Sequence, residues 1–63
     1  MNLIAEIYNM TKAERLVRPF TKYRLDISNF VVGRTETLET HYCKDKREAR
    51  AIADRANANP WNF

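Results

Sequence analysis

The chain predicts a small α+β domain in which a three-stranded antiparallel sheet carries one C-terminal helix packed on one face (β-β-β-α). Three observations predict this fold. Apolar residues recur with period two in the first half, β-forming residues gather between positions 30 and 42, and an apolar stripe of helical period follows position 45. The sequence shows no repeat or linker, so residues 1–63 are expected to form one domain.

The first strand is expected within residues 1–10. Leu3, Ala5 and Ile7 stand at every second position, which places their side chains on one face of a strand. The polar residues that follow, 11–14, are typical of a loop or of a single helical turn.

The second strand is expected over residues 20–27. Tyr23, Leu25 and Ile27 share one face, and charged residues occupy the alternate positions, which indicates a half-buried strand with one face in water. Pro19 cannot donate a hydrogen bond to a sheet and is therefore expected at the start of this strand or on an edge.

The third strand is expected between Phe30 and Tyr42, and its register stays open. Gly33 indicates a bulge or a turn of positive φ, so the connecting loop lies either at 28–30 or at 33–35. The choice decides which face of the sheet Leu38 occupies.

The helix begins after Asp45, which is a favourable N-cap with Glu48 at the capping-box spacing. Pro60 disfavours helical geometry at the residue before it, so the helix is expected to end near Ala58. The apolar stripe that would face the sheet consists of Ala49, Ile52, Ala53 and Ala56.

The composition offers little for catalysis. His41 and Cys43 point the same way on a strand, but two soft ligands fall short of the four that zinc normally takes, and a lone cysteine is more often a small buried apolar residue. The carboxylates show no acid–base pair. We therefore expect a non-enzymatic protein with no metal and no cofactor.

The other sheet face, left uncovered by the helix, is where we expect function. Long cationic side chains interleaved with aromatic ones suit contacts to a partner or to phosphate groups. Trp61 is expected to fold back onto the core, with an exposed partner anchor as the alternative. The candidate partner-binding residues are Tyr8, Arg18, Phe20, Lys22, Arg24 and Trp61.

The net charge and the lengths of the apolar stretches limit which classes of partner are expected. A net charge of +3 with a pI near 9.4 is compatible with nucleic acid but is also ordinary for a soluble small domain. No stretch approaches the roughly 20 apolar residues that span a bilayer, and Glu6 interrupts the start of the chain too early for a signal peptide. We expect a cytoplasmic protein without a membrane partner, and a homodimer is compatible with a domain this small.

The run from Thr40 to Ala53, THYCKDKREARAIA, together with Tyr23-Arg24-Leu25, resembles the amino-terminal arm-binding domain of phage-type tyrosine recombinases. In that family a three-stranded sheet packs on a helix and enters the DNA major groove. The resemblance implies that Lys22 and Arg24 contact DNA from the sheet face. The turn glycines typical of the family's hairpin are missing here.

In its small size, single domain and lack of a characteristic motif, the chain is also similar to short accessory proteins of bacteriophages and prophages. These proteins often act by clamping a host enzyme. This similarity implies a cytoplasmic protein that binds a host protein and inhibits or redirects it. The alternative is a small DNA-binding protein that uses the same basic sheet face.

Overall fold

The computed structural model describes residues 3–63. It confirms an α+β fold and corrects the details, because the sheet has four strands of mixed direction and a second helix lies between the first two strands. The elements are β1 (Leu3–Asn9), α1 (Lys12–Val17), β2 (Tyr23–Val31), β3 (Arg34–Cys43), α2 (Lys46–Arg55) and β4 (Asn59–Pro60).

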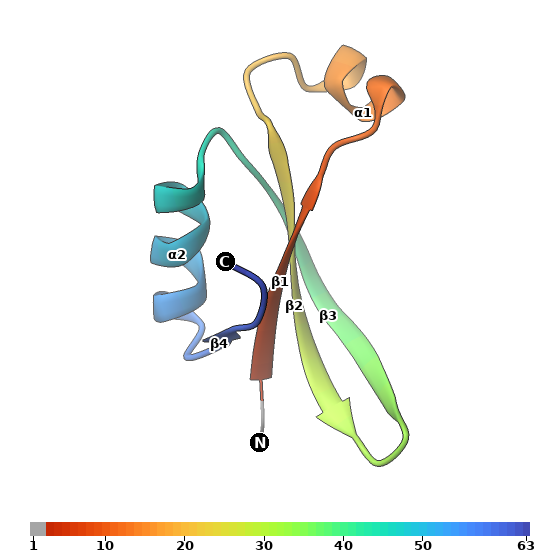
Figure 1. Cartoon of the computed structure of the whole chain (residues 1–63), viewed down its shortest axis with the longest axis vertical. Helices are drawn as coiled ribbons and strands as arrows, with labels where there is room; N and C mark the ends of the chain where they lie inside the picture. The colour runs from red at the N-terminus through yellow and green to blue at the C-terminus, as the bar shows by residue number, and fades with distance from the viewer. Residues whose placement is uncertain (1–2) are drawn as a thin grey trace.

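The strands lie in the order β3-β2-β1-β4 (Figure 1). The three long strands pair antiparallel, with Ala5 opposite Ile27 on one side and Leu25 opposite His41 on the other. The short β4 pairs parallel to β1, through Ile4 and Ala5. It could not be expected from the sequence, because two residues carry no periodic pattern.

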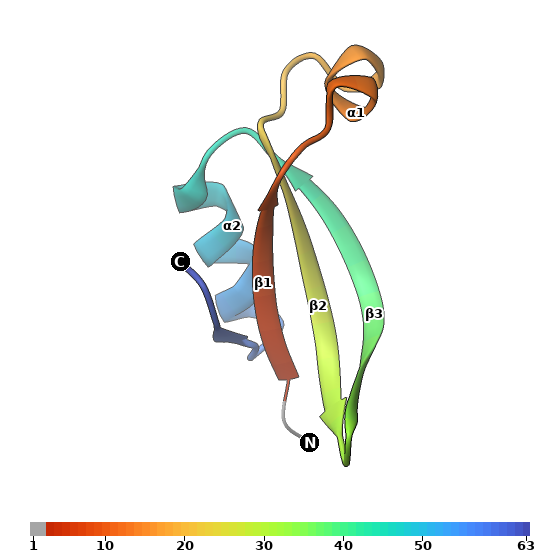
Figure 2. The ribbon, with the colours of Figure 1, turned by 45° about the vertical axis from the view of Figure 1, so that its right-hand side comes forward.

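Helix α2 lies on one side of the sheet, as Figure 2 shows, and the core is the layer between them. The predicted period-two pattern is confirmed on β1 and β2, and the predicted helical stripe is confirmed on α2. Alanines at the contact let the helix lie close to the strands. The buried core consists of Ala5, Ile7, Leu25, Ile27, Cys43, Ala49, Ala53 and Ala58.

Helix α2 begins where the sequence predicts, since the Asp45 side chain accepts a 2.8 Å hydrogen bond from the Glu48 backbone amide. Its expected end near Ala58 is wrong. The helix stops at Arg55 because Asn57 adopts a left-handed conformation with φ of 55°. The amide of Ala58 then bonds to the Ala53 carbonyl, which completes a Schellman cap with asparagine in the usual place of glycine.

Helix α1 replaces the loop or single turn expected at residues 11–14. The Thr11 hydroxyl accepts from the Glu14 amide, and the Glu14 carboxylate accepts from the Thr11 amide at 2.9 Å, which forms a complete capping box. The signal was present in the sequence as threonine followed three residues later by glutamate. None of the helix's residues is buried, so no apolar stripe revealed it.

Of the two loop positions left open by the sequence, 28–30 is wrong, and the turn lies at Val32 and Gly33, so it only overlaps the expected 33–35. Strand β2 continues through 28–31, and Gly33 supplies the positive φ of 82° that the two-residue turn requires. A bulge at Leu38 shifts the register between Ile27 and Ser28. The hairpin extends beyond the helix-covered body and contributes to the 35 Å length of the molecule (Figure 1).

Candidate functional site

The sheet face opposite α2, here called the open face, carries the candidate site. Side chains alternate across a strand, so the register places one set of residues on this face. Exposed apolar, aromatic and charged groups all occur among them. From β1 to β3 they are Ile4, Glu6, Tyr8, Arg24, Asp26, Ser28, Phe30, Thr35, Thr37, Thr40 and Tyr42.

At the α1 end of this face, three residues from neighbouring strands form an aromatic–cation row. Arg24 lies opposite both Tyr8 and Tyr42 in the strand register, and its guanidinium lies 4.7 Å from the Tyr8 ring centroid. Arg18, just after α1, lies 4.2 Å from the Tyr42 ring centroid. Both arginines therefore make cation–π contacts with neighbouring aromatic rings.

Two carboxylates lie beside the arginine of this row. Arg24 lies 3.5 Å from Asp26 and 3.9 Å from Glu14 of α1, although its buried Nε makes no well-aligned hydrogen bond. Hydrogen bonding to the Thr11 amide, with a smaller contribution from Arg24, lowers the pKa of Glu14. The Arg24–Glu14 ion pair and the Arg18–Tyr42 ring contact link α1 to this end of the open face.

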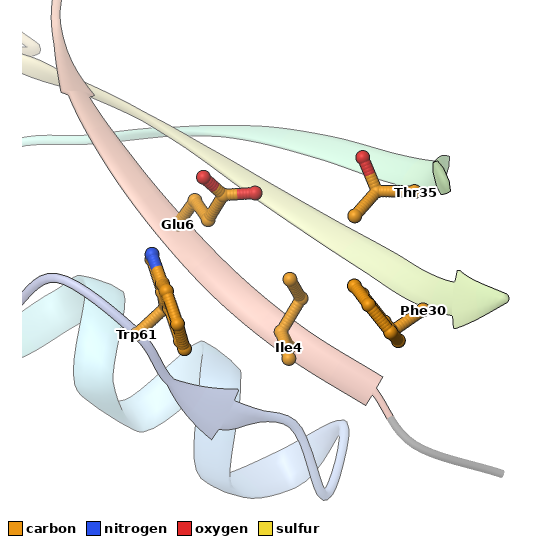
Figure 3. A pocket seen from close by; sticks show the side chains of 5 residues that line it. All are labelled: Ile4, Glu6, Phe30, Thr35 and Trp61. Atoms are coloured by element: carbon orange, nitrogen blue, oxygen red, sulfur yellow. The ribbon is translucent and has the colours of Figure 1, made fainter. Parts of the chain in front are cut away.

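The other end of the open face is hollowed into a groove of about 500 Å³. Figure 3 shows Trp61 and Phe30 on either side of Ile4, with Glu6 and Thr35 above them. We call this the Trp61 groove. Trp61 is 70% exposed and Phe30 is 55% exposed, so both aromatic rings remain largely open to a ligand.

The expectation that Trp61 closes the core is wrong. The Trp61 amide donates to the Ala5 carbonyl at 2.8 Å, which continues the pairing along the edge of β1 and turns the indole onto the open face. Phe63 packs against the core in its place, with the Arg50 guanidinium 5.4 Å from its ring centroid. The aromatic tail thus supplies one core residue and one surface residue.

The six residues predicted to bind a partner do not form one site. Tyr8 and Arg24 belong to the aromatic–cation row, and Arg18 contacts this row at the Tyr42 ring. Trp61 lies in the groove at the other end of the face. Phe20 and Lys22 lie in the connection between α1 and β2, where Phe20 is 90% exposed.

The groove also contains Ile4, Glu6 and Phe30, which the sequence did not indicate as site residues. Phe30 could have been placed if β2 had been extended through residues 28–31, because it then shares a face with Arg24 by simple alternation. The undecided loop position prevented this assignment.

Cys43 is fully buried beneath α2, whereas His41 is half-buried with its Nε2 3.8 Å from Glu39. Burial raises the pKa of the Cys43 thiol to about 11, so the thiol is protonated at neutral pH and is a poor nucleophile and metal ligand. Within residues 3–63, no group of three or more His, Cys, Asp or Glu side chains could hold a metal ion.

Positive charge gathers at the α1 end of the molecule, outside the groove. Seven of the eleven lysines and arginines occur in segments 11–22 and 43–48, together with three carboxylates. These segments meet where the Lys22 amide donates to the Cys43 carbonyl at 2.8 Å. The rest of the chain carries a slight excess of carboxylates, so the protein is electrically polarised from end to end.

No family model, curated protein or solved structure matches this chain. Neither α1 nor α2, the helices of the described range, has the length and apolar character needed to cross a membrane. The open face, with its Trp61 groove, and the basic end of the molecule are therefore the features that bear on function.

Proposed function

We propose that this chain is a non-enzymatic binding protein that docks its open face on a larger host protein and thereby inhibits or redirects it. The observation that carries the proposal is the exposure of Trp61 and Phe30 around one apolar groove. The short phage-type accessory proteins that the chain resembles in size often act by clamping a host enzyme.

The exposure of these two aromatic side chains lowers the stability of the fold, which is already small in a domain of this size. A chain of 63 residues gains most from burying its largest side chains, yet Trp61, the only tryptophan, stands outside the core. Exposed tryptophan and phenylalanine beside polar groups are typical of the centre of a protein interface. A partner that covers the groove would recover this apolar burial.

The groove is also well positioned before binding. Ile4, Glu6, Phe30 and Thr35 project from paired strands, and Trp61 follows the short β4 on a tail hydrogen-bonded to β1. Side chains on rigid elements lose less conformational entropy on binding, which favours affinity. This geometry supports docking by a largely preformed surface.

The proposal is tested by capture from bacterial lysate with tagged protein, after nuclease treatment and at moderate salt. A host protein should be retained, and Trp61→Ala and Phe30→Ala should each lower its recovery severalfold, since hot-spot truncations cost about 2 kcal/mol or more. Leu16→Ala is the matched control, because Leu16 is 77% exposed on α1, away from the groove. Equal recovery by all four proteins would refute docking through this face.

The charge distribution supports a second candidate, nucleic-acid binding through the basic end. Here the contacts would come from Lys12, Arg15, Lys22 and the lysines that flank Asp45, in place of the sheet face implied by the recombinase resemblance. On the open face Arg24 is already paired with carboxylates. In salt titrations with duplex DNA, Arg15→Gln and Lys22→Gln should each reduce the salt slope by about one, and Arg34→Gln in the distant hairpin should leave it unchanged.

A further inference from the structure

Glu6 lies in the Trp61 groove without a cationic partner. The residue is half-buried on β1, and its Oε2 accepts a 3.0 Å hydrogen bond from the Tyr8 hydroxyl. Among the described residues, no lysine or arginine nitrogen lies within 4.0 Å of its carboxylate. Glu6 contrasts in this respect with Asp26 and Glu14, which both lie beside Arg24.

The register makes this arrangement electrostatically unfavourable. Glu6 stands directly opposite Asp26 on the open face, and like charges at such positions destabilise a sheet. Asp26 is compensated by Arg24 and by the Thr40 hydroxyl, which donates to it at 3.0 Å. The Glu6 carboxylate is compensated only by the hydrogen bond from the Tyr8 hydroxyl. A cation placed in the groove would relieve the remaining repulsion.

The walls of the groove suit the rest of such a ligand. Ile4 forms an apolar floor between Trp61 and Phe30, while the Glu6 carboxylate lies at one side (Figure 3). An alkyl chain packs well on aliphatic and aromatic surface, and a cationic head group is attracted both to a carboxylate and to aromatic faces. A lysine or arginine side chain combines these two parts, and an acidic or phosphate-bearing ligand would be repelled by Glu6.

We propose that the Trp61 groove binds a lysine or arginine side chain presented by an exposed segment of the partner protein, with Glu6 as its counter-ion. This inference rests on the proposed function and adds the chemistry of the partner. The alkyl stem lies on Ile4 and Trp61, and the charged head group pairs with the free carboxylate oxygen of Glu6. Binding therefore selects a basic segment of the host surface.

Trp61 is the only tryptophan, so its fluorescence reports directly on the groove. The probe is an acetylated and amidated glycine pentapeptide with one central lysine, titrated at constant ionic strength. A single side chain of this size is expected to bind with a dissociation constant on the order of millimolar. Matched peptides carry norleucine, which keeps the alkyl chain and lacks the charge, or glutamate, which reverses it.

The lysine peptide should change the Trp61 emission saturably, the norleucine peptide should bind about fivefold more weakly, and the glutamate peptide should not bind. Glu6→Gln should lower the lysine peptide's affinity to that of norleucine. Glu39→Gln removes the same charge from β3 on the helix-side face and should leave the affinity unchanged. Circular dichroism of both variants establishes that they are folded.

Equal affinity for lysine and norleucine, or no effect of Glu6→Gln, would overturn the role of the carboxylate. Self-association that Glu6→Gln abolishes, without peptide binding, would assign the groove to a second copy of this chain and would also overturn the proposal. Lysate capture separates this inference from the proposed function. Recovery that depends on Trp61 but not on Glu6 would leave the docking function standing and refute only the cationic ligand.

Discussion

The side-chain amide of Asn62 pairs with both backbone polar groups of Ile7. Its Oδ1 accepts from the Ile7 amide and its Nδ2 donates to the Ile7 carbonyl, each at 2.8 Å. A side chain here makes the two hydrogen bonds that a neighbouring strand residue would make. Together with β4 and the Trp61 amide, it covers the outer edge of β1 and holds Trp61 beside the groove.

We predict that Asn62→Ala lowers the free energy of unfolding by about 2 kcal/mol, because two hydrogen bonds worth about 1 kcal/mol each are lost. The measurement is urea denaturation followed by circular dichroism. Asn59→Ala is the control, since Asn59 is exposed and pairs with β1 through its backbone. If the two variants were equally stable, the Asn62 pairing would not contribute to the fold.

Arg24 should contribute to the attachment of α1. We predict that Arg24→Gln destabilises the protein by about 1 kcal/mol, because it removes the Tyr8 ring contact and the pairing with Asp26 and Glu14. Amide hydrogen exchange should also become faster in α1. Lys22→Gln makes the same charge change at an exposed site outside these pairs and should stay within about 0.5 kcal/mol of the parent protein.

The parts of the fold that the sequence predicted are those with a periodic apolar pattern. Ala5 and Ile7 on β1, and Ala49 and Ala53 on α2, repeat at the period of their element and are buried as expected. Helix α1 and β4 lack such a pattern. Their positions depend on a capping box at Thr11 and on hydrogen bonds to a distant strand edge, which no local pattern of hydrophobicity reveals.

The candidate site was only partly predictable for the same reason. The alternation of side chains places Tyr8 and Arg24 on the open face. The groove, however, forms only because the C-terminal tail that carries Trp61 pairs with β1. This pairing depends on the left-handed Asn57 and on the Asn62 side chain, 55 residues from its partner Ile7. The sequence favoured Trp61 as a core residue, whereas the backbone pairing at Trp61 leaves that place to Phe63.

Cys43 should make the protein less stable in alkali. The folded thiol has a pKa of about 11 against an ordinary value of 9.0, because burial disfavours the thiolate. The raised pKa contributes stability that is fully present below pH 9 and is lost as the pH rises towards 11.

Denaturation of the parent protein and of Cys43→Ala across this pH range measures the effect. The variant should be about 1 kcal/mol less stable at neutral pH, and the difference should shrink as the pH rises. A thiol reagent should label the parent protein slowly until it is unfolded. Rapid labelling of the folded protein at neutral pH would contradict the buried, protonated thiol.

The capping box of α1 should make that helix sensitive to acid. The Thr11 amide, which donates to the Glu14 carboxylate, lowers the pKa of Glu14 below its ordinary value of 4.5. A lowered pKa contributes stability that is present above the ordinary value and lost as the pH falls through the folded value. The hydrogen-exchange protection factors of the α1 amides, which correct for the slower intrinsic exchange at low pH, should therefore fall on acidification before those of the sheet amides.

Two variants separate the halves of this cap. Thr11→Ala removes the hydroxyl that accepts from the Glu14 amide and should destabilise α1 by about 1 kcal/mol at neutral pH. Glu14→Gln keeps an acceptor for the Thr11 amide but cannot titrate, so the protection factors of its α1 amides should depend less on pH. Acid sensitivity of α1 that persisted unchanged in Glu14→Gln would show that another group controls the helix. Because α1 buries no residue of its own, its stability depends on the cap, on the pairing of Glu14 with Arg24 and on the contact of Arg18 with the Tyr42 ring.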